Sequence, residues 1–448
     1  FMIFDSTDIE ILRKSLDTLA KGFSNLPDFS SEHDRTSLDS VLNETAKKMH
    51  ENFPYHHPLY AGQMLKPPHP IARLAYAMSM CLNPNNHALD GGIASSAMEK
   101  ECITQLGSMF GWEASLGHIC SGGTMANLEA LWVANRIHPD KKIVASEQTH
   151  YTHERISDVL SLKFDKAAVS PNGRMDIDSL KYLLSKGNVG TVVVTLGTTG
   201  VGAVDPLSEI LDIREKYNFR IHVDAAYGGY FHIASELQTD ARRAFDRIHE
   251  VDSIVIDPHK HGLQPYGCGC VLFRDSKVSA LYKHDSPYTY FSSDDLHLGE
   301  ISLECSRAGS AAVALWATQK MLPMNPGGEF AQSLDKCLLA ARALWQQLDE
   351  SDFYKCLMLP ETDIVVYAAN ADDVANSSRK AREIFTHAAK QHLHLALIEL
   401  PTDMVRNYWP NLDGDDPTIT CLRSCLMKSE HLDWIEKIYS ILESSAKL

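Results

Sequence analysis

The sequence predicts an α/β protein with a mostly parallel sheet that helices cover on both faces. Three observations predict this class. Short runs rich in valine and isoleucine recur between about residues 70 and 320, a glycine-containing or polar turn follows each run, and segments of helix length separate them. With 448 residues, of which 44% are hydrophobic, the chain can form a large core and more than one domain.

The N-terminal part predicts helices that lie outside this sheet. Residues 7–22 have the apolar spacing of an amphipathic helix, which Gly22 ends. The chain up to about residue 60 then alternates helix-like and polar pieces, so we expect residues 1–60 to form an N-terminal helical arm. The prolines of residues 65–70 predict a loop.

The large domain is expected to span residues 61–322. Its predicted strands are residues 142–145, 191–195, 220–223, 253–256 and 270–273. Prolines and glycines in residues 322–328 break the chain, and residues 323–448 are expected to form a smaller α+β domain. In this domain the alternating residues 392–398 predict a strand, and residues 433–442 predict a helix.

The composition excludes several functional classes. The net charge of −16 argues against nucleic-acid binding, which needs a surplus of Lys and Arg. The apolar runs are too short for a membrane span, and no basic-then-apolar leader opens the chain, so we expect a cytoplasmic protein. The ten cysteines are scattered without a zinc spacing, which predicts reduced thiols and no metal site.

Side chains with useful chemistry follow the predicted strands. In an open α/β sheet, ligands bind beyond the carboxyl ends of the strands. The residues that follow four of these strands are His150, Thr198, Thr199, Asp224, Ala226 and Lys260. Upstream, a glycine turn leads into a helix and contains Gly122, Gly123 and Thr124. Such a turn can bind phosphate, because its N–H groups approach closely and the helix N-terminus favours an anion.

Each of these residues alone also fits a structural role. Thr124 and Asp224 can be caps of a helix or turn, His150 can be an ordinary structural histidine, and Lys260 can be a surface lysine. Together they match one chemistry, which needs an anion cradle, a carboxylate for a ring nitrogen, a flat partner for a ring and an amine that forms an imine. Pyridoxal 5′-phosphate (PLP) requires these four groups, and we expect it as the cofactor.

The sequence resembles the group II PLP-dependent amino-acid decarboxylases of the aspartate aminotransferase-like fold superfamily. The match covers most of the chain and is strongest between about residues 87 and 320. The motifs that carry it are residues 95–101, 121–128, 195–206, 222–229, 257–260 and 303–309. The first of them reads S-S-A-M-E-K-E and departs from the family's usual S-P-A-x-T-E-x-E.

The resemblance implies a large PLP-binding domain with a seven-stranded sheet, a small C-terminal domain, and an arm exchanged within a homodimer that shares its active sites. It implies that the enzyme converts an L-amino acid to its amine and carbon dioxide through a Schiff base on Lys260. Asp224 would bind the ring nitrogen, and His150 would pack on the ring. The other cofactor-binding residues would be Gly122, Gly123, Thr124, Thr198, Ala226, His259 and Ser306. Ser306 and the adjacent Arg307 would approach the cofactor of the partner subunit.

The resemblance also suggests a proton donor and a substrate pocket. In this family a tyrosine on the loop after the lysine strand often donates the Cα proton, and the candidates here are Tyr288 and Tyr290. Tyr60 and Gln63 lie where the family places part of the substrate pocket. Because this region lacks the F-P-T run of aromatic amino-acid decarboxylases, we expect an acidic or polar substrate such as glutamate or aspartate. The basic diaminobutyrate is the alternative.

Three other functions stay open at this point. A PLP-dependent carbon–carbon lyase shares the motif H-V-D-A-A-Y-G-G, but it usually carries a membrane anchor and a site for a substrate phosphate. In an oxidative aldehyde synthase one loop residue diverts the reaction, and a tyrosine there favours simple decarboxylation. A catalytically silent PLP-binding scaffold is the third, although every expected cofactor residue is present.

Overall fold

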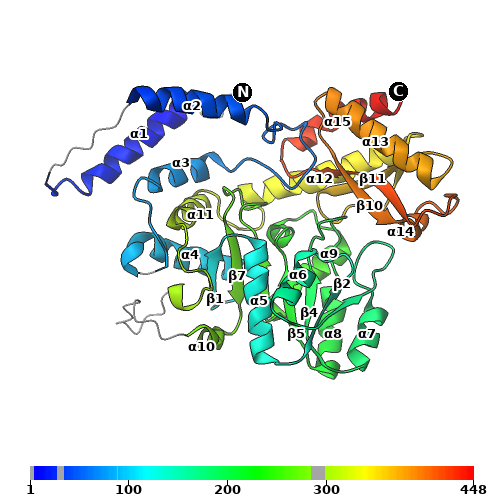
Figure 1. Ribbon diagram of the computed structural model, residues 1–448, viewed down its shortest axis with the longest axis horizontal. Coiled ribbons are helices and arrows are strands. Elements are labelled where there is room, and N and C mark those ends of the chain that lie inside the picture. The colour runs from blue at the N-terminus through cyan, green and yellow to red at the C-terminus, as the bar shows by residue number, and fades with distance from the viewer. Residues whose placement is uncertain (1–4, 28–34, 88, 284–297, 448) are drawn as a thin grey trace.

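The computed structural model describes residues 5–27, 35–87, 89–283 and 298–447 (Figure 1). Within these residues the strands of the large domain form one seven-stranded sheet. The strands are β1 (Leu116–Cys120), β2 (Lys142–Ser146), β3 (Phe164–Ala167), β4 (Val189–Thr195), β5 (Arg220–Asp224), β6 (Ser253–Ile256) and β7 (Gly269–Phe273). Tyr288 and Tyr290 lie outside the described residues.

The large sheet is mostly parallel, as the sequence predicted. Its strand order is β1-β7-β6-β5-β4-β2-β3. Strand β7 runs antiparallel to both of its neighbours, and the remaining neighbours pair in parallel. The central strands β4 and β6 are buried along their whole length, which explains their continuous valine- and isoleucine-rich sequence.

Helices pack against this sheet and connect its strands. Helix α5 contacts β6 and β7, α4 contacts β1, and α7 contacts β3. The helices of the large domain are α3 (Pro70–Ser79), α4 (Ile93–Met109), α5 (Gly123–Ile137), α6 (Thr152–Val159), α7 (Ile177–Ser185), α8 (Leu207–Tyr217), α9 (Thr239–Asp246), α10 (Ser279–Tyr282) and α11 (Gly309–Met321).

All five predicted strands are confirmed, and the two edge strands, β1 and β3, were not predicted. Strand β1 reads L-G-H-I-C, and its glycine and histidine hide the strand pattern. Gly117 is required there, because an added Cβ would lie 2.5 Å from the carbonyl oxygen of Val271 on β7. Strand β3 reads F-D-K-A and is only partly buried, so charged residues are tolerated at this edge.

A second, antiparallel sheet forms the core of the small domain. Its order is β10-β11-β9-β8. Its elements are α12 (Glu329–Asp349), β8 (Tyr354–Cys356), β9 (Ile364–Ala369), α13 (Val374–Lys390), β10 (Ala396–Pro401), α14 (Thr402–Arg406), β11 (Thr418–Cys425) and α15 (His431–Ala446). The strand predicted at residues 392–398 begins later, because His392 follows α13 with a positive φ of 66°.

The N-terminal helices lie beside the large domain in Figure 1, with α1 (Ser6–Lys21) close to α3. Neither α1 nor α2 (Arg35–Met49) buries a side chain within the described chain. The predicted arm ends at residue 60, within a segment that is hydrogen-bonded to the small domain. The Ala61 N–H donates to the His394 carbonyl (2.8 Å), and the Cys425 N–H donates to the Ala61 carbonyl (2.8 Å).

The described residues contain neither a membrane-spanning helix nor a cluster of metal ligands. None of the helices there combines the length and the hydropathy that crossing a bilayer requires. In the same part of the chain, no three His, Cys, Asp or Glu side chains converge in a way that would hold a metal ion.

Candidate active site

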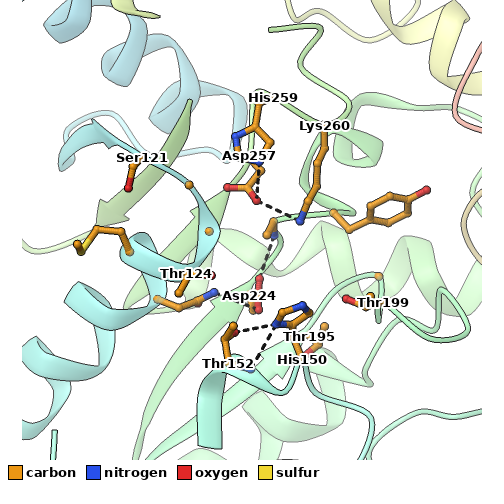
Figure 2. Close-up of a pocket in the computed structure, with 17 residues that line it drawn as sticks. Ser121, Thr124, His150, Thr152, Thr195, Thr199, Asp224, Asp257, His259 and Lys260 are labelled. Carbon is orange, nitrogen blue, oxygen red and sulfur yellow. Dashed lines mark hydrogen bonds and ion pairs between the residues drawn. The ribbon is translucent and has the colours of Figure 1, made fainter. Parts of the chain in front are cut away.

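A cavity of about 290 Å³ lies at the carboxyl ends of the central strands of the large sheet (Figure 2). Its walls come from the segments that follow β1, β2, β4, β5 and β6, as expected for a ligand site of an open α/β sheet. The predicted site residues that line it are Gly122, Gly123, Thr124, His150, Asp224, Ala226, His259 and Lys260.

The glycine turn forms one wall where side chains would not fit. Gly122 has a φ of +156°, and Gly123 opens helix α5. A Cβ added to Gly123 would lie 2.7 Å from Asp257 Oδ2, and one added to Gly122 would lie 3.1 Å from His259 Cε1. Because the first N–H groups of a helix have no partner within the helix, this wall presents backbone donors to the cavity. Such a wall suits a phosphate group.

Asp224 supplies a buried carboxylate at the end of β5. Its Oδ1 accepts the Ala226 N–H (3.1 Å), and its Oδ2 accepts from Asn127 Nδ2 (3.2 Å) and from His153 Nε2 (2.7 Å). Burial by itself would raise the pKa of this carboxyl. The hydrogen bond and charge of His153, the Ala226 N–H and the charge of Lys260 outweigh burial, and the pKa is lowered. Asp224 is therefore an anion throughout the neutral pH range.

Lys260 reaches the cavity from the turn after β6. Its Nζ lies 3.0 Å from Asp257 Oδ2, and its side chain is 21% exposed. Asp257 is almost fully buried, and its Oδ1 has no hydrogen-bond partner among the described residues. The lysine amine is thus held close to a carboxylate and open toward the cavity, as Figure 2 shows.

Two histidines flank these groups, and both have lowered pKa values. Burial is the main cause for His150 and for His259. The Thr152 N–H donates to His150 Nδ1 (3.3 Å), so Nδ1 is an acceptor and Nε2 carries the proton of the neutral ring. The Cys268 N–H donates to His259 Nδ1 (3.3 Å), and the His259 ring lies 4.7 Å from the ring of Tyr266.

Thr198 does not line the cavity in this chain, and its role in cofactor binding stays a prediction. The Thr198 side chain is fully buried, and its Oγ1 accepts the Ala203 N–H (3.0 Å) inside the turn after β4. Its neighbour Thr199 lines the cavity. The sequence motif contains both threonines, and only the backbone conformation decides which of them faces the cavity.

The predicted substrate residues do not line the cavity in this chain. The Tyr60 side chain is buried, and its hydroxyl accepts the Gln63 N–H (3.3 Å), whereas Gln63 itself is exposed. A nearby residue links this segment to the site, because the Tyr266 hydroxyl donates to the Met64 carbonyl (3.1 Å). A substrate role for Tyr60 and Gln63 stays a prediction.

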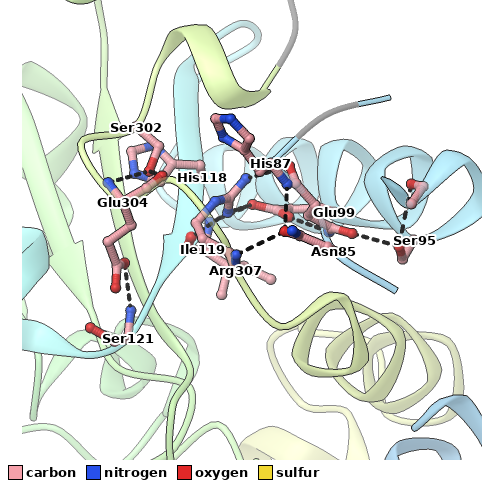
Figure 3. Close-up of polar contacts among 12 residues, drawn as sticks. Asn85, His87, Ser95, Glu99, His118, Ile119, Ser121, Ser302, Glu304 and Arg307 are labelled. Carbon is pink, nitrogen blue, oxygen red and sulfur yellow. Dashed lines mark hydrogen bonds and ion pairs between the residues drawn. The ribbon is translucent and has the colours of Figure 1, made fainter. Parts of the chain in front are cut away.

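Ser306 and Arg307 lie outside the cavity of their own chain. Ser306 is exposed, and its Oγ accepts from Asn85 Nδ2 (3.2 Å). The Arg307 guanidinium points into the chain, where its Nη1 contacts Glu99 Oε1 (2.5 Å) and the Ile119 carbonyl (2.5 Å), as Figure 3 shows. A contact of Ser306 with a partner's cofactor stays a prediction.

Sequence reasoning missed several residues of the site. Asn127, Asp257 and Tyr227 line the cavity, and His153 contacts Asp224 from behind. Two of them carry a signal in the sequence. Asn127 follows Gly123 by four residues, and His153 follows His150 by three, so each lies one helical turn after a predicted site residue.

The residues present fit PLP. The glycine turn at the start of α5 lines the cavity and offers backbone N–H donors at a helix N-terminus, which suits a phosphate. Asp224 offers an ionised, buried carboxylate for a protonated ring nitrogen, and Lys260 offers an amine for an aldehyde. All three lie around one cavity.

Comparison with known proteins identifies the family of this chain. Residues 71–369 match the model of the pyridoxal-dependent decarboxylase conserved domain. The chain is 32% identical over 310 residues to the probable L-tyrosine/L-aspartate decarboxylase of Methanothermobacter thermautotrophicus, covering 68% of this chain and 82% of that protein.

Solved structures share the fold. Mouse CSAD superposes with a TM-score of 0.77 at 19% identity and covers 98% of this chain, while 99% of that chain is matched. A sphingosine-1-phosphate lyase of Burkholderia pseudomallei gives a TM-score of 0.75 at 16% identity, with 94% of this chain and 93% of that chain covered. The family match over two thirds of the sequence and the site geometry together show that the chain belongs to the pyridoxal-dependent decarboxylases and is a PLP-dependent carboxy-lyase.

Proposed function

We propose that this enzyme converts an L-amino acid to its amine and carbon dioxide, and that Lys260 is the residue that binds PLP covalently. One observation carries the proposal: the Lys260 amine, the Asp224 carboxylate and the glycine wall of α5 surround a single cavity. When bound, PLP supplies an electron-accepting ring that stabilises the charge left on Cα as carbon dioxide departs.

The roles of the protein groups follow from their contacts. Asp224, ionised and fixed by three donors, holds a proton at the ring nitrogen through a charge-assisted hydrogen bond. His150 is neutral, so its ring can pack on an aromatic system without adding charge. Asp257 lies 3.0 Å from Lys260 Nζ and orients the lysine amine toward the cavity.

The substrate is proposed from two lines of support. The sequence favours an acidic or polar amino acid, and the similar protein of Methanothermobacter thermautotrophicus is named for L-tyrosine and L-aspartate. L-aspartate satisfies both, so we propose it as the first substrate and L-tyrosine as the second. Among the described residues no arginine lines the cavity. The side-chain carboxylate of an acidic substrate would therefore need a cation from residues other than the described ones that line the cavity.

The test is product release from a panel of amino acids. The purified enzyme with PLP is incubated with L-aspartate, L-tyrosine, L-glutamate or L-2,4-diaminobutyrate, and carbon dioxide and amine are measured separately. We expect equal amounts of both products from at least one amino acid. Aldehyde and ammonia in place of the amine would indicate an oxidative aldehyde synthase. A cofactor absorbance that responds to amino acids without any carbon dioxide would contradict decarboxylation.

We also propose a homodimer in which the N-terminal helices contact the partner subunit. Helices α1 and α2 bury none of their side chains, and they expose large apolar residues that include Ile9, Leu38, Val41 and Leu42. An apolar surface of this kind marks an interaction site. Sedimentation should give twice the single-chain mass for the wild type. The double substitution Val41→Asp and Leu42→Asp should shift it toward the monomer, and an active wild-type monomer would refute the proposal.

A further inference from the structure

His153 is a buried, titratable side chain to which the proposed catalytic roles give no task. It lies in the first turn of α6 and has no exposed surface. Its Nε2 lies 2.7 Å from Asp224 Oδ2. Its other ring nitrogen, Nδ1, is buried without a hydrogen-bond partner among the described residues. Among the described residues, the polar contact of the His153 ring is therefore with Asp224 Oδ2.

A second donor to the same oxygen is fixed from behind by a chain of hydrogen bonds. Asn127 Nδ2 donates to Asp224 Oδ2 (3.2 Å), and Asn127 Oδ1 accepts from His222 Nε2 (2.8 Å). His222 Nδ1 lies 2.8 Å from Ser253 Oγ on the neighbouring strand β6. Because an amide donates only through its nitrogen, this chain sets the orientation of Asn127. His222 adds no charge, since burial lowers its pKa to about 3.

Of the contacts around Asp224, the one from His153 does most to keep the carboxylate ionised. Burial favours the protonated carboxyl, and His153 is the largest of the contacts that oppose burial and lower the Asp224 pKa. Lys260 contributes to this lowering, and other titratable side chains close to this group are Asp257 and the neutral His150. A Lys260 amine that holds the cofactor would no longer supply the positive charge that lowers the Asp224 pKa. His153 and the neutral donors then remain to stabilise the anion.

We propose that His153 is a positioning residue that holds Asp224 as an anion, so that the proton shared with PLP stays on the ring nitrogen rather than on the carboxylate. The inference rests on the proposed role of Asp224. Only the position of this proton changes, between the ring nitrogen and the Asp224 carboxylate, and no bond to carbon forms or breaks. A proton on the ring nitrogen makes the ring a stronger electron acceptor, so the effect should appear in kcat.

The test places PLP labelled with ¹⁵N at its ring nitrogen in the enzyme and measures the nitrogen chemical shift by NMR. The matched pair is His153→Met and His153→Gln, whose side chains have similar length and differ in the N–H donor. We expect the wild type and His153→Gln to show a protonated nitrogen. In His153→Met the signal should move toward the unprotonated position, and kcat should fall by about tenfold or more with little change in KM.

Controls separate this inference from general damage and from the proposed function. His118→Met removes another buried histidine that pairs with a carboxylate, Glu129 (3.1 Å), outside the cavity, and should leave the nitrogen shift unchanged. A wild-type shift in His153→Met, or in His153→Leu if the methionine variant does not fold, overturns the inference. Asp224→Ala tests the proposed function alone, because an unchanged shift there would mean that Asp224 is not the ring partner.

Discussion

Replacing Lys260 with alanine should reduce kcat by about 10³-fold or more, because the variant loses the amine proposed to bind the cofactor and to exchange with the substrate amine. The fold should survive with reduced stability, because Lys260 is partly exposed but its removal leaves the buried Asp257 without its ammonium partner. Carbon dioxide release measures the loss of activity. Borohydride treatment followed by peptide mass spectrometry should find the cofactor mass on the Lys260 peptide of the wild type only.

A second lysine provides the control for this variant. Lys142 lies on β2 and pairs with Asp165 (2.7 Å) near the surface, away from the cavity. Lys142→Ala should keep wild-type activity and the labelled Lys260 peptide. Activity in Lys260→Ala within tenfold of the wild type, or cofactor mass on another lysine, would show that the assignment of Lys260 is wrong.

Replacing Glu99 with glutamine should destabilise the protein by about 3–5 kcal/mol, because it leaves the buried Arg307 charge without its partner. The Glu99 carboxylate accepts from Arg307 Nη1 (2.5 Å), the Ile119 N–H (2.8 Å) and Asn86 Nδ2 (2.6 Å). An amide in this place turns one acceptor into a donor that faces other donors. Urea unfolding should show a lower midpoint with an unchanged slope.

The neighbouring helix position offers a matched control on α4. Glu101 pairs with Lys320 (3.4 Å), and both side chains are about half exposed. Because solvent screens such a pair, Glu101→Gln should leave the free energy of unfolding almost unchanged. Equal unfolding midpoints for the Glu99 and Glu101 variants would mean that the Arg307 cluster adds no stability to the fold.

The sequence predicts the centre of the large sheet well and its edges poorly. A strand that is buried on both faces, such as β4, is rich in apolar β-branched residues, and this leaves a clear run in the sequence. The edge strand β3 meets solvent, and its aspartate and lysine remove that run. The register of β1 depends on the contact of Gly117 with β7, which no local pattern reveals.

The same distinction applies to the site. Residues directly after a strand, such as Asp224 and Lys260, were predicted because the carboxyl ends of parallel strands share one edge of the sheet. His153 was missed, because its approach to Asp224 depends on how helix α6, which packs against α5, places its first turn. The choice between Thr198 and Thr199 depends on the turn conformation, to which the sequence of two adjacent threonines gives no guide.

The short segment at residues 59–61 constrains how this chain folds. Leu59 and Ala61 complete the apolar core of the small domain, and the bridge from Tyr60 to His394 spans most of the chain length. During synthesis the apolar residues 59–61 therefore stay unpaired until the last strands of the small sheet have been made. Contacts of such long sequence separation slow folding and leave intermediates open to aggregation. Recombinant yield should accordingly depend on temperature and chaperones, and a large domain produced without residues 323–448 would carry this segment without its partner.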